Sequence, residues 1–133
     1  MHRRLMLAIP LLLGLAACQA PAARTELAQR PVQVVFFTED SAALGADARA
    51  VVADAAQLAK ANPNAPVAVL GFAGPGGSQG FNQALSDARA RNVADALAAG
   101  GVAPGRIQIR PRGPVPFEMM PTESRRVEIR VGR

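Results

Sequence analysis

Apolar residues recur along this chain with two different periods, and the order of these stretches limits what the chain can fold into. Two stretches, 46–61 and about 81–99, have apolar residues at helical spacing. The apolar stripe of the first is Ala48, Val51, Val52, Ala55 and Leu58, and that of the second is Phe81, Leu85, Ala88, Val93, Ala96 and Leu97. Asn62-Pro63 and Gly100-Gly101 follow these stretches and end the two predicted helices.

Four other stretches predict β-strands. Residues 32–37 and 67–70 are short runs rich in valine, with little that is polar, which is typical of buried strands. Residues 107–110 and 125–131 alternate apolar with polar side chains, as half-buried strands do. The chain has no Trp, no Tyr and five Phe, so the core is expected to consist mainly of Val, Ile, Leu and Ala.

The predicted elements follow the order β-α-β-α-β-β. A glycine-rich loop, 71–80, precedes the second helix, and a proline-rich connection, 111–121, precedes the last strand. Because strand–helix–strand units cross over with one hand, we expect a mixed sheet with both helices on one face. The sequence therefore predicts an α/β fold of the α+β sandwich type over residues 32–133.

The N-terminal residues indicate the compartment. Arg3 and Arg4 precede an apolar stretch of 11 residues, Leu5 to Leu15, well below the ~20 residues of a transmembrane helix. The following Leu15-Ala16-Ala17-Cys18 resembles the bacterial lipobox, in which the cysteine sulfur takes a diacylglycerol before the leader is removed. Cys18 is the only cysteine and has no disulfide partner. We expect a signal peptide at 1–17 and a lipid-bearing Cys18; the alternative is an ordinary secretory leader with an incidental cysteine.

The leader divides the chain into a signal peptide, 1–17, a lipidated cysteine with its tether, 18–31, and a domain, 32–133. The tether is Ala-rich and polar, without an apolar face that predicts a helix. The 13 residue-to-residue steps from Cys18 to Pro31 span at most about 45 Å when the chain is fully extended. Gln19 is not the aspartate of the pattern for inner-membrane retention. We therefore expect an acylated, palmitate-bearing lipoprotein in the outer membrane, with its domain facing the periplasm.

The formal charge of +5 is unevenly distributed, because residues 105–133 hold seven Arg against three Glu. A basic segment of this kind can bind nucleic acid. However, no aromatic residues are interleaved for base stacking, so no nucleic-acid partner is expected.

Groups that could carry catalysis are scarce. His2, the only histidine, leaves with the leader, and Cys18 is acylated, which excludes Ser-His and Cys-His nucleophile systems and most zinc sites. Glu39-Asp40 is the one close carboxylate pair; a solvated turn is the expected role and acid–base chemistry the alternative. The loop 74–79 misses the final glycine of the dinucleotide fingerprint, and there is no Gly-Lys-Ser/Thr motif. We expect no enzyme, no metal site and no cofactor.

Several segments resemble the OmpA-like C-terminal domain, the module of the peptidoglycan-associated lipoproteins. Residues 82–93, NQALSDARARNV, resemble its N-x-x-L-S-x-x-R-A-x-x-V segment. Residues 37–44 are similar to the start of its first helix, and 124–129, SRRVEI, to its closing N-R-R-V-E-I strand. Gly71 and Gly77 stand where its G-H-T-D-x-x-G loop has glycines. The resemblance covers about residues 32–131, in the family's order of elements.

The resemblance implies non-covalent binding of peptidoglycan through the diaminopimelate of the stem peptide. By resemblance, Arg89 takes the ligand carboxylate as a charge-assisted, bidentate pair. Asn82 hydrogen-bonds nearby, Leu85 and Phe37 line the pocket, and Arg125 supports its edge.

The ligand loop departs from the family. The aspartate that meets the ammonium group falls at Gly74, with Ala73 and Phe72 in place of the family's threonine and histidine, and the asparagine of N-R-R is Ser124. A charged hydrogen bond of this kind contributes about 1.5–3 kcal/mol. Glu39 and Asp40 are candidate replacements if they border the same pocket.

The leading expectation is a non-enzymatic outer-membrane lipoprotein that contacts peptidoglycan and tethers the envelope. The alternative is a degenerate domain of the same fold that has lost diaminopimelate recognition. Such a domain would bind protein partners in an envelope assembly.

Overall fold

The structure is a computed structural model that describes the backbone of residues 20–133 and the side chains from residue 25 onward. The predicted signal peptide, 1–17, and Cys18 lie outside the described residues. Within the described part of the chain, none of the helices has the length and apolar character needed to cross a bilayer.

Four strands form one mixed sheet in the order β1-β4-β2-β3. They are β1 (Gln33–Phe36), β2 (Val67–Ala73), β3 (Ile107–Pro114) and β4 (Arg126–Val131). Strands β2 and β3 are parallel, and β4 runs antiparallel to both β1 and β2. The predicted mixed sheet is confirmed.

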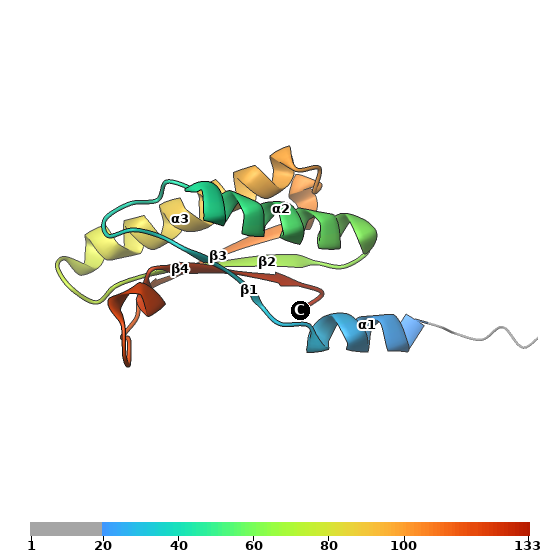
Figure 1. The fold of residues 1–133 in the computed structure, drawn as a ribbon, viewed down its shortest axis with the longest axis horizontal. Helices are drawn as coiled ribbons and strands as arrows, with labels where there is room; N and C mark the ends of the chain where they lie inside the picture. The colour runs from blue at the N-terminus through green and yellow to red at the C-terminus, as the bar shows by residue number, and fades with distance from the viewer. Residues whose placement is uncertain (1–19) are drawn as a thin grey trace, which may run out of the picture.

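Helices α2 (Ala46–Ala61) and α3 (Gln79–Ala99) cover one face of this sheet (Figure 1). Short 3₁₀ turns, η1 (Pro104–Arg106) and η2 (Pro121–Ser124), precede β3 and β4. The predicted order of strands and helices and the placement of both helices on one face are therefore confirmed.

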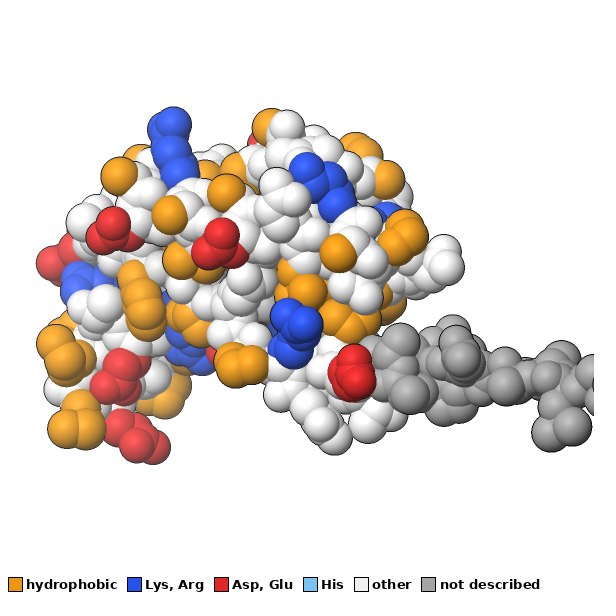
Figure 2. Space-filling model, turned by 45° about the vertical axis from the view of Figure 1, so that its right-hand side comes forward, with side chains coloured by type: hydrophobic (Ala, Val, Ile, Leu, Met, Phe, Trp, Pro, Cys, Tyr) orange, Lys and Arg blue, Asp and Glu red, His pale blue; other side chains and the backbone are white. Residues whose placement is uncertain are grey.

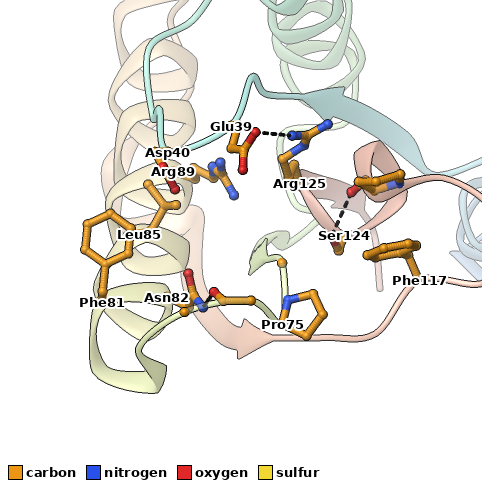
Figure 3. Close-up of a pocket in the computed structure, with 14 residues that line it drawn as sticks. Glu39, Asp40, Pro75, Phe81, Asn82, Leu85, Arg89, Phe117, Ser124 and Arg125 are labelled. Carbon is orange, nitrogen blue, oxygen red and sulfur yellow. Dashed lines mark hydrogen bonds and ion pairs between the residues drawn. The ribbon is translucent and has the colours of Figure 1, made fainter.

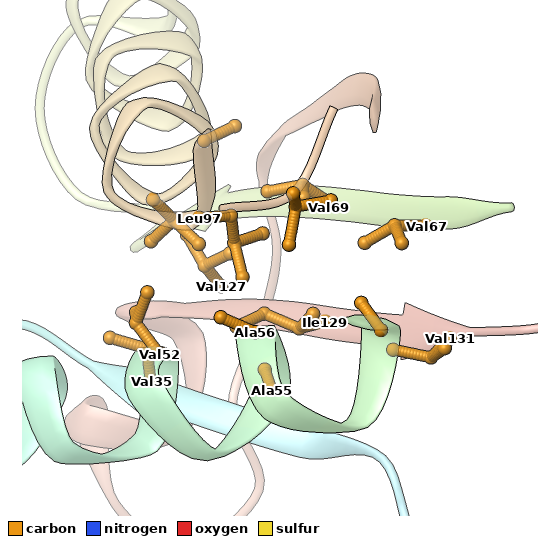
Figure 4. Close-up of a cluster of buried hydrophobic side chains, with 14 of the residues drawn as sticks. Val35, Val52, Ala55, Ala56, Val67, Val69, Leu97, Val127, Ile129 and Val131 are labelled. Atoms are coloured by element: carbon orange, nitrogen blue, oxygen red, sulfur yellow. The ribbon is translucent and has the colours of Figure 1, made fainter. Parts of the chain in front are cut away.

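The main core lies between the sheet and the two helices (Figure 4). It is built from aliphatic side chains, among them Val35, Val69, Leu97 and Ile129, each at most 1% exposed. All residues of β2 are buried, because this strand is flanked by β4 and β3. A smaller cluster of Ala68, Leu70 and Phe72, with Val115 against it, lies apart from the main core. Every residue of both clusters lies within residues 27–131.

The predicted tether contains a helix, α1 (Ala20–Gln29), which the sequence did not predict. Its one buried residue among those described is Leu27, which packs so closely on Gly132 that a Cβ there would be 3.0 Å from the Leu27 Cβ. The Arg133 guanidinium donates to the carbonyls of Ala28 and Arg30 at 2.8 and 2.7 Å. The contact of Leu27 and the hydrogen bonds of Arg133 hold α1 against the domain. Because only one apolar residue is buried among the described side chains of α1, its sequence has no apolar periodicity that would predict a helix. As a helix, its ten residues span only about 15 Å. The tether is therefore shorter than the roughly 45 Å expected for an extended chain.

Two strands are longer than predicted. Strand β3 continues through Pro111 to Pro114, so the proline-rich connection begins later than expected. Because β3 is an edge strand, a proline in it leaves no ladder partner unsatisfied on its open side. Strand β2 continues to Ala73, which shortens the glycine-rich loop to residues 74–78.

Candidate functional site

A cavity of about 710 Å³ opens at the end of the molecule where α3 begins. The β1–α2 loop, the β2–α3 loop and η2 form its other walls (Figure 3). Its lining residues are Glu39, Asp40, Gly74, Pro75, Gly76, Gly77, Phe81, Asn82, Leu85, Arg89, Phe117, Pro121, Ser124 and Arg125.

The first half of α3 buries polar side chains instead of the predicted apolar stripe. Asn82, Ser86 and Arg89 are 4%, 0% and 0% exposed, whereas Phe81 is 52% exposed. Phe81 and Leu85 line the cavity and Ala88 is half-buried, so the predicted core stripe is wrong for these three residues. The physical reason is that Asn82, Ser86 and Arg89 form hydrogen bonds with backbone groups of the loops and strands that lie beneath α3.

The close approach of α3 to the sheet depends on Gly71. A Cβ at Gly71 would lie 2.1 Å from the backbone carbonyl oxygen of Ser86. The Ser86 hydroxyl donates to the Gln83 carbonyl at 2.8 Å and accepts from the Gly113 amide at 3.0 Å. These contacts join the start of α3 to β2 and β3, and so fix one wall of the cavity.

Arg89 extends from α3 to the back of the cavity, where backbone carbonyls hold its guanidinium. Nε donates to Ser41 O at 2.8 Å, one terminal nitrogen to Phe72 O at 3.1 Å and the other to Thr38 O at 3.0 Å. No carboxylate among the described side chains forms an ion pair with it. Burial lowers the pKa of Arg89, the positive charge of Arg125 lowers it further, and Asp40 opposes both.

Phe37 does not line the cavity, contrary to the prediction. Its ring is 4% exposed and lies beneath Arg89, with the guanidinium carbon 5.2 Å from the ring centroid. Phe37 directly follows β1 and belongs to the main core, so the ring supports the arginine from the core side. Leu85, by contrast, lines the cavity as predicted.

Arg125, which directly follows η2, lines the wall of the cavity that faces α3. One of its terminal nitrogens is 3.8 Å from the Glu39 carboxylate and the other donates to the Thr122 hydroxyl at 3.2 Å. Its Nε is buried without a hydrogen-bond partner in the described part of the chain. The Glu39 side chain is 81% exposed, so this ion pair lies at the cavity mouth.

The loop that differs from the family pattern is held by Asn82, whose side-chain amide donates to the Gly76 carbonyl at 2.6 Å. Gly74 faces η2, and a Cβ there would lie 3.3 Å from the Ser124 hydroxyl. That hydroxyl donates to the Pro121 carbonyl at 2.7 Å. The cavity wall therefore carries no side chain at the position of the family's aspartate, and a side chain there would require a small shift of Ser124.

The predicted site residues come together, with the exception of Phe37. Asn82, Leu85, Arg89 and Arg125 line one cavity, and the candidate replacement acids Glu39 and Asp40 border it as well. Two further cavity residues are not indicated by the sequence: the helical spacing of Phe81 predicts a core position, and Phe117 lies in an irregular loop without any pattern.

The loop between β3 and η2 forms an apolar rim beside the cavity. Phe117, Met119 and Met120 are 40%, 86% and 61% exposed. Figure 2 shows hydrophobic side chains together with acidic ones at this end of the molecule, opposite α1. Among the described residues, no group of three or more His, Cys, Asp or Glu could hold a metal ion.

The model of the OmpA family matches residues 36–124. The chain belongs to the OmpA family.

Solved structures share the fold. One is the peptidoglycan-associated lipoprotein from Burkholderia pseudomallei, with a TM-score of 0.69 and 24% identity over 74% of this chain and 89% of that one. The OmpA-like domain of FopA1 from Francisella tularensis has a TM-score of 0.64 and 24% identity over 72% and 68%. The periplasmic domain of Helicobacter pylori MotB has a TM-score of 0.62 and 20% identity over 73% and 69%. A search of curated protein sequences gave no match.

Proposed function

We propose that this protein binds peptidoglycan non-covalently in the cavity between α3 and η2, through the diaminopimelate of the stem peptide. The observation that carries the proposal is the environment of Arg89. A buried charge without a counter-ion is costly, and this guanidinium borders an open cavity with no paired carboxylate among the described side chains. A ligand carboxylate would supply the missing negative charge.

The hydrogen-bonding capacity of Arg89 fits that role. A guanidinium has five N–H donors, and backbone carbonyls take three of them. Two donors are left, and because the side chain has no exposed surface, a ligand carboxylate would reach them only by displacing the atoms that cover the guanidinium from the cavity side. The Nε of Arg125 on the facing wall also lacks a hydrogen-bond partner in the described part of the chain, although it is buried.

Glu39 and Asp40 support recognition of the ligand's ammonium group. Both border the cavity, the condition under which they would replace the aspartate that the family has at Gly74. Diaminopimelate ends in a zwitterion, so the two arginines and the two acids would match its opposite charges. The proposed ligand orientation places the carboxylate at Arg89 and the amine toward the β1–α2 loop.

Blocking the cavity without touching its charged groups tests the proposal. Gly76 lines the cavity and a Cβ there meets nothing within 4 Å, which makes Gly76→Phe a blocking variant. Gly105 also has open space around its Cβ and lies in η1, outside the cavity, so Gly105→Phe is the matched control. Both are made in a chain that begins at Gln19 and contains both cores.

The measurement is retention of these proteins on purified murein. The proposal expects retention of the wild type and of Gly105→Phe, and loss of retention in Gly76→Phe. If the wild type is not retained, or if both variants behave alike, this site does not bind murein. Release of soluble murein fragments during the incubation would identify an enzyme and contradict the proposed non-enzymatic role.

We further propose that Cys18 carries the lipid that holds this domain at the outer membrane, facing the periplasm. The support is the lipobox-like segment in the sequence. Metabolic labelling with palmitate should mark the wild-type protein and leave Cys18→Ser unmarked. Label in both proteins, or in neither, would contradict the anchor.

The exposed apolar rim at Phe117, Met119 and Met120 favours a second candidate function, binding of a protein partner in an envelope assembly. Contiguous exposed apolar side chains are typical of interaction surfaces. This alternative would be supported if the wild type does not bind murein but binds a protein partner, and if Met119→Glu abolishes binding of that partner.

A further inference from the structure

The seven arginines of residues 105–133 fall into two groups in the structure. Three lie outside the strands of the sheet, where they donate to carbonyls near the ends of helices or border the cavity. Arg106 donates to carbonyls after and at the end of α2, Arg125 borders the cavity, and Arg133 donates to carbonyls at the end of α1. The other four form what we call the arginine face: Arg110, Arg112, Arg126 and Arg130.

The strand register places two of these residues on the sheet face that α2 and α3 leave uncovered. Arg130 of β4 is the cross-strand partner of Ala68, which belongs to the small cluster outside the main core. The Arg126 guanidinium lies 4.1 Å from the centroid of the Phe72 ring, which belongs to the same cluster. Residues opposite each other in a sheet share a face, so both arginines cover this cluster.

The edge strand β3 contributes the other two. Arg110 pairs with Leu70, a further member of the small cluster, and so lies on the same face. Arg112 follows two residues later on the same edge strand, within the stretch after Pro111 where the register of β3 against β2 shifts. Both arginines are exposed. The only side-chain hydrogen bond that either makes within the described residues joins Arg110 to Gln108.

Along its strands the arginine face has one acidic residue against four basic ones, while Glu123 of η2 lies close enough to Arg126 for that charge to add to the backbone hydrogen bonds that lower the pKa of the Glu123 carboxyl. Glu128, the cross-strand partner of Leu70, forms ion pairs with Arg126 and Arg130 at 3.1 and 2.6 Å. The four arginines minus this glutamate leave a charge of +3. The opposite side of the molecule differs, because α2 and α3 carry Asp47, Asp54, Asp87 and Asp95 against the exposed Arg49, Lys60 and Arg91.

An exposed aromatic residue accompanies this charge. Phe36 of β1 is 53% exposed and is the cross-strand partner of Arg126. Basic side chains beside an exposed phenylalanine are typical of surfaces that lie on a membrane. In Figure 1, α1 leaves the domain on the side of the sheet away from α2 and α3, which is the side of the arginine face.

We propose that the arginine face docks on the phosphate headgroups of an anionic bilayer. The proposal rests on the membrane anchor at Cys18 proposed above. Guanidinium groups bind phosphate through paired hydrogen bonds. Three of them lie on this sheet face and the fourth, Arg112, lies beside them on the exposed edge strand. Because α1 spans only about 15 Å and is held to the domain through Leu27 and Arg133, an anchor before α1 would keep this face near the bilayer.

Binding to vesicles tests this inference. The protein is the chain that begins at Gln19, which lacks Cys18, so no lipid on the protein contributes. The vesicles consist of phosphatidylcholine, with or without anionic phosphatidylglycerol, and contain no murein. The variant is Arg110→Gln/Arg112→Gln, and the matched control removes two charges from the helical side as Arg49→Gln/Arg91→Gln.

The inference expects binding to the anionic vesicles alone, weakening as salt is added. Loss of Arg110 and Arg112 should weaken it by about 30-fold, since each basic residue near an anionic surface adds roughly a five-fold factor. The control should bind as the wild type does. Absent wild-type binding, equal binding to neutral vesicles, or an equal loss in both variants would overturn the inference.

The murein assay separates this inference from the proposed function. Arg110 and Arg112 do not line the cavity, so their double variant should be retained on murein like the wild type. Failure on vesicles with retention on murein would overturn the membrane contact alone. Vesicle binding without murein retention would overturn the proposed function alone.

Discussion

Arg89 has no exposed surface, yet the acceptors that hold it are all backbone carbonyls. Carbonyl dipoles orient a guanidinium without neutralising it, so the positive charge is retained at the back of the cavity. Arg125 nearby lowers the pKa of Arg89 through repulsion, after the larger effect of burial. The two arginines therefore concentrate positive charge at this end of the cavity, which the proposed binding of a ligand carboxylate requires.

At the residue scale, restoring the family's aspartate should strengthen binding. Gly74→Asp places a carboxylate beside Ser124, whose hydroxyl must move by a few tenths of an ångström to accommodate the new Cβ at 3.3 Å. A charged hydrogen bond to the ligand amine is expected to raise the affinity for murein by about ten-fold or more. The measurement is a binding isotherm on murein.

The matched control for this change is Gly74→Asn, which has the same shape without the charge. It should bind like the wild type. Equal gains in both variants would show that packing, and not an ion pair with the ligand amine, accounts for the change. No gain in either would contradict the proposed place of the amine.

At the scale of the elements, the contact between α3 and β2 fixes the position of Arg89, and Gly71 permits that contact. Gly71→Ala should destabilise the fold by about 3 kcal/mol or more, because its Cβ would meet the Ser86 carbonyl at 2.1 Å, a backbone atom that cannot turn away. Chemical denaturation measures the loss. Gly105→Ala, with open space around the new Cβ, is the control and should be nearly neutral; equal stability of the two would contradict the packing described.

The second prediction about stability concerns Glu128 of β4, which should make the free energy of unfolding depend on pH. Burial raises the pKa of Glu128, but hydrogen bonds from Arg130 and Arg126 outweigh it, so the folded-state pKa lies below the ordinary value of 4.5. A carboxyl of this kind stabilises the fold above its unfolded pKa, and the stabilisation is lost as the pH falls through the folded value. The free energy of unfolding should therefore decrease below about pH 4.5.

Removing this carboxyl tests the sign of the effect. Glu128→Gln should weaken the dependence of the unfolding free energy on acid pH without abolishing it, because backbone amides of Glu118 and Met120 also lower the pKa of Glu123. Glu26→Gln on α1, an exposed position, is the control. An unchanged acid dependence in Glu128→Gln would contradict the assignment.

Periodicity predicted the helices and strands because burial of one face imposes a repeat on the sequence. It failed where a polar face is buried, as at Asn82, Ser86 and Arg89, since hydrophobicity alone then points to the wrong side of α3. It failed for α1 because a helix held by Leu27 and Arg133 needs no apolar stripe. The extension of β3 through Pro111 depends on its place at the sheet edge, which only the assembled sheet decides.

The resemblance to the OmpA-like domain indicated site residues that hydrophobic periodicity alone did not indicate. It brought Asn82, Leu85, Arg89 and Arg125 to one cavity, and the structure places them there. Phe37 was misplaced because a motif does not say which side of an arginine a ring occupies. Phe117 carried no pattern, since its position depends on how the β3–η2 loop folds back.

At the scale of the whole molecule, the cavity and α1 lie at opposite ends of the long axis (Figure 1). A chain anchored before α1 would thus present its cavity away from the point of attachment. With the arginine face on the bilayer, as proposed above, the cavity would open beside the membrane at the end of the domain away from the anchor.

The central claim is that Arg89 binds a carboxylate of the stem peptide. Isothermal titration of the chain that begins at Gln19 with a diaminopimelate-containing tripeptide tests it most directly, alongside the same peptide with the diaminopimelate carboxylate amidated. The account predicts binding of the free acid and at least about ten-fold weaker binding of the amide. Equal affinity for the two peptides, or binding of neither, would contradict it.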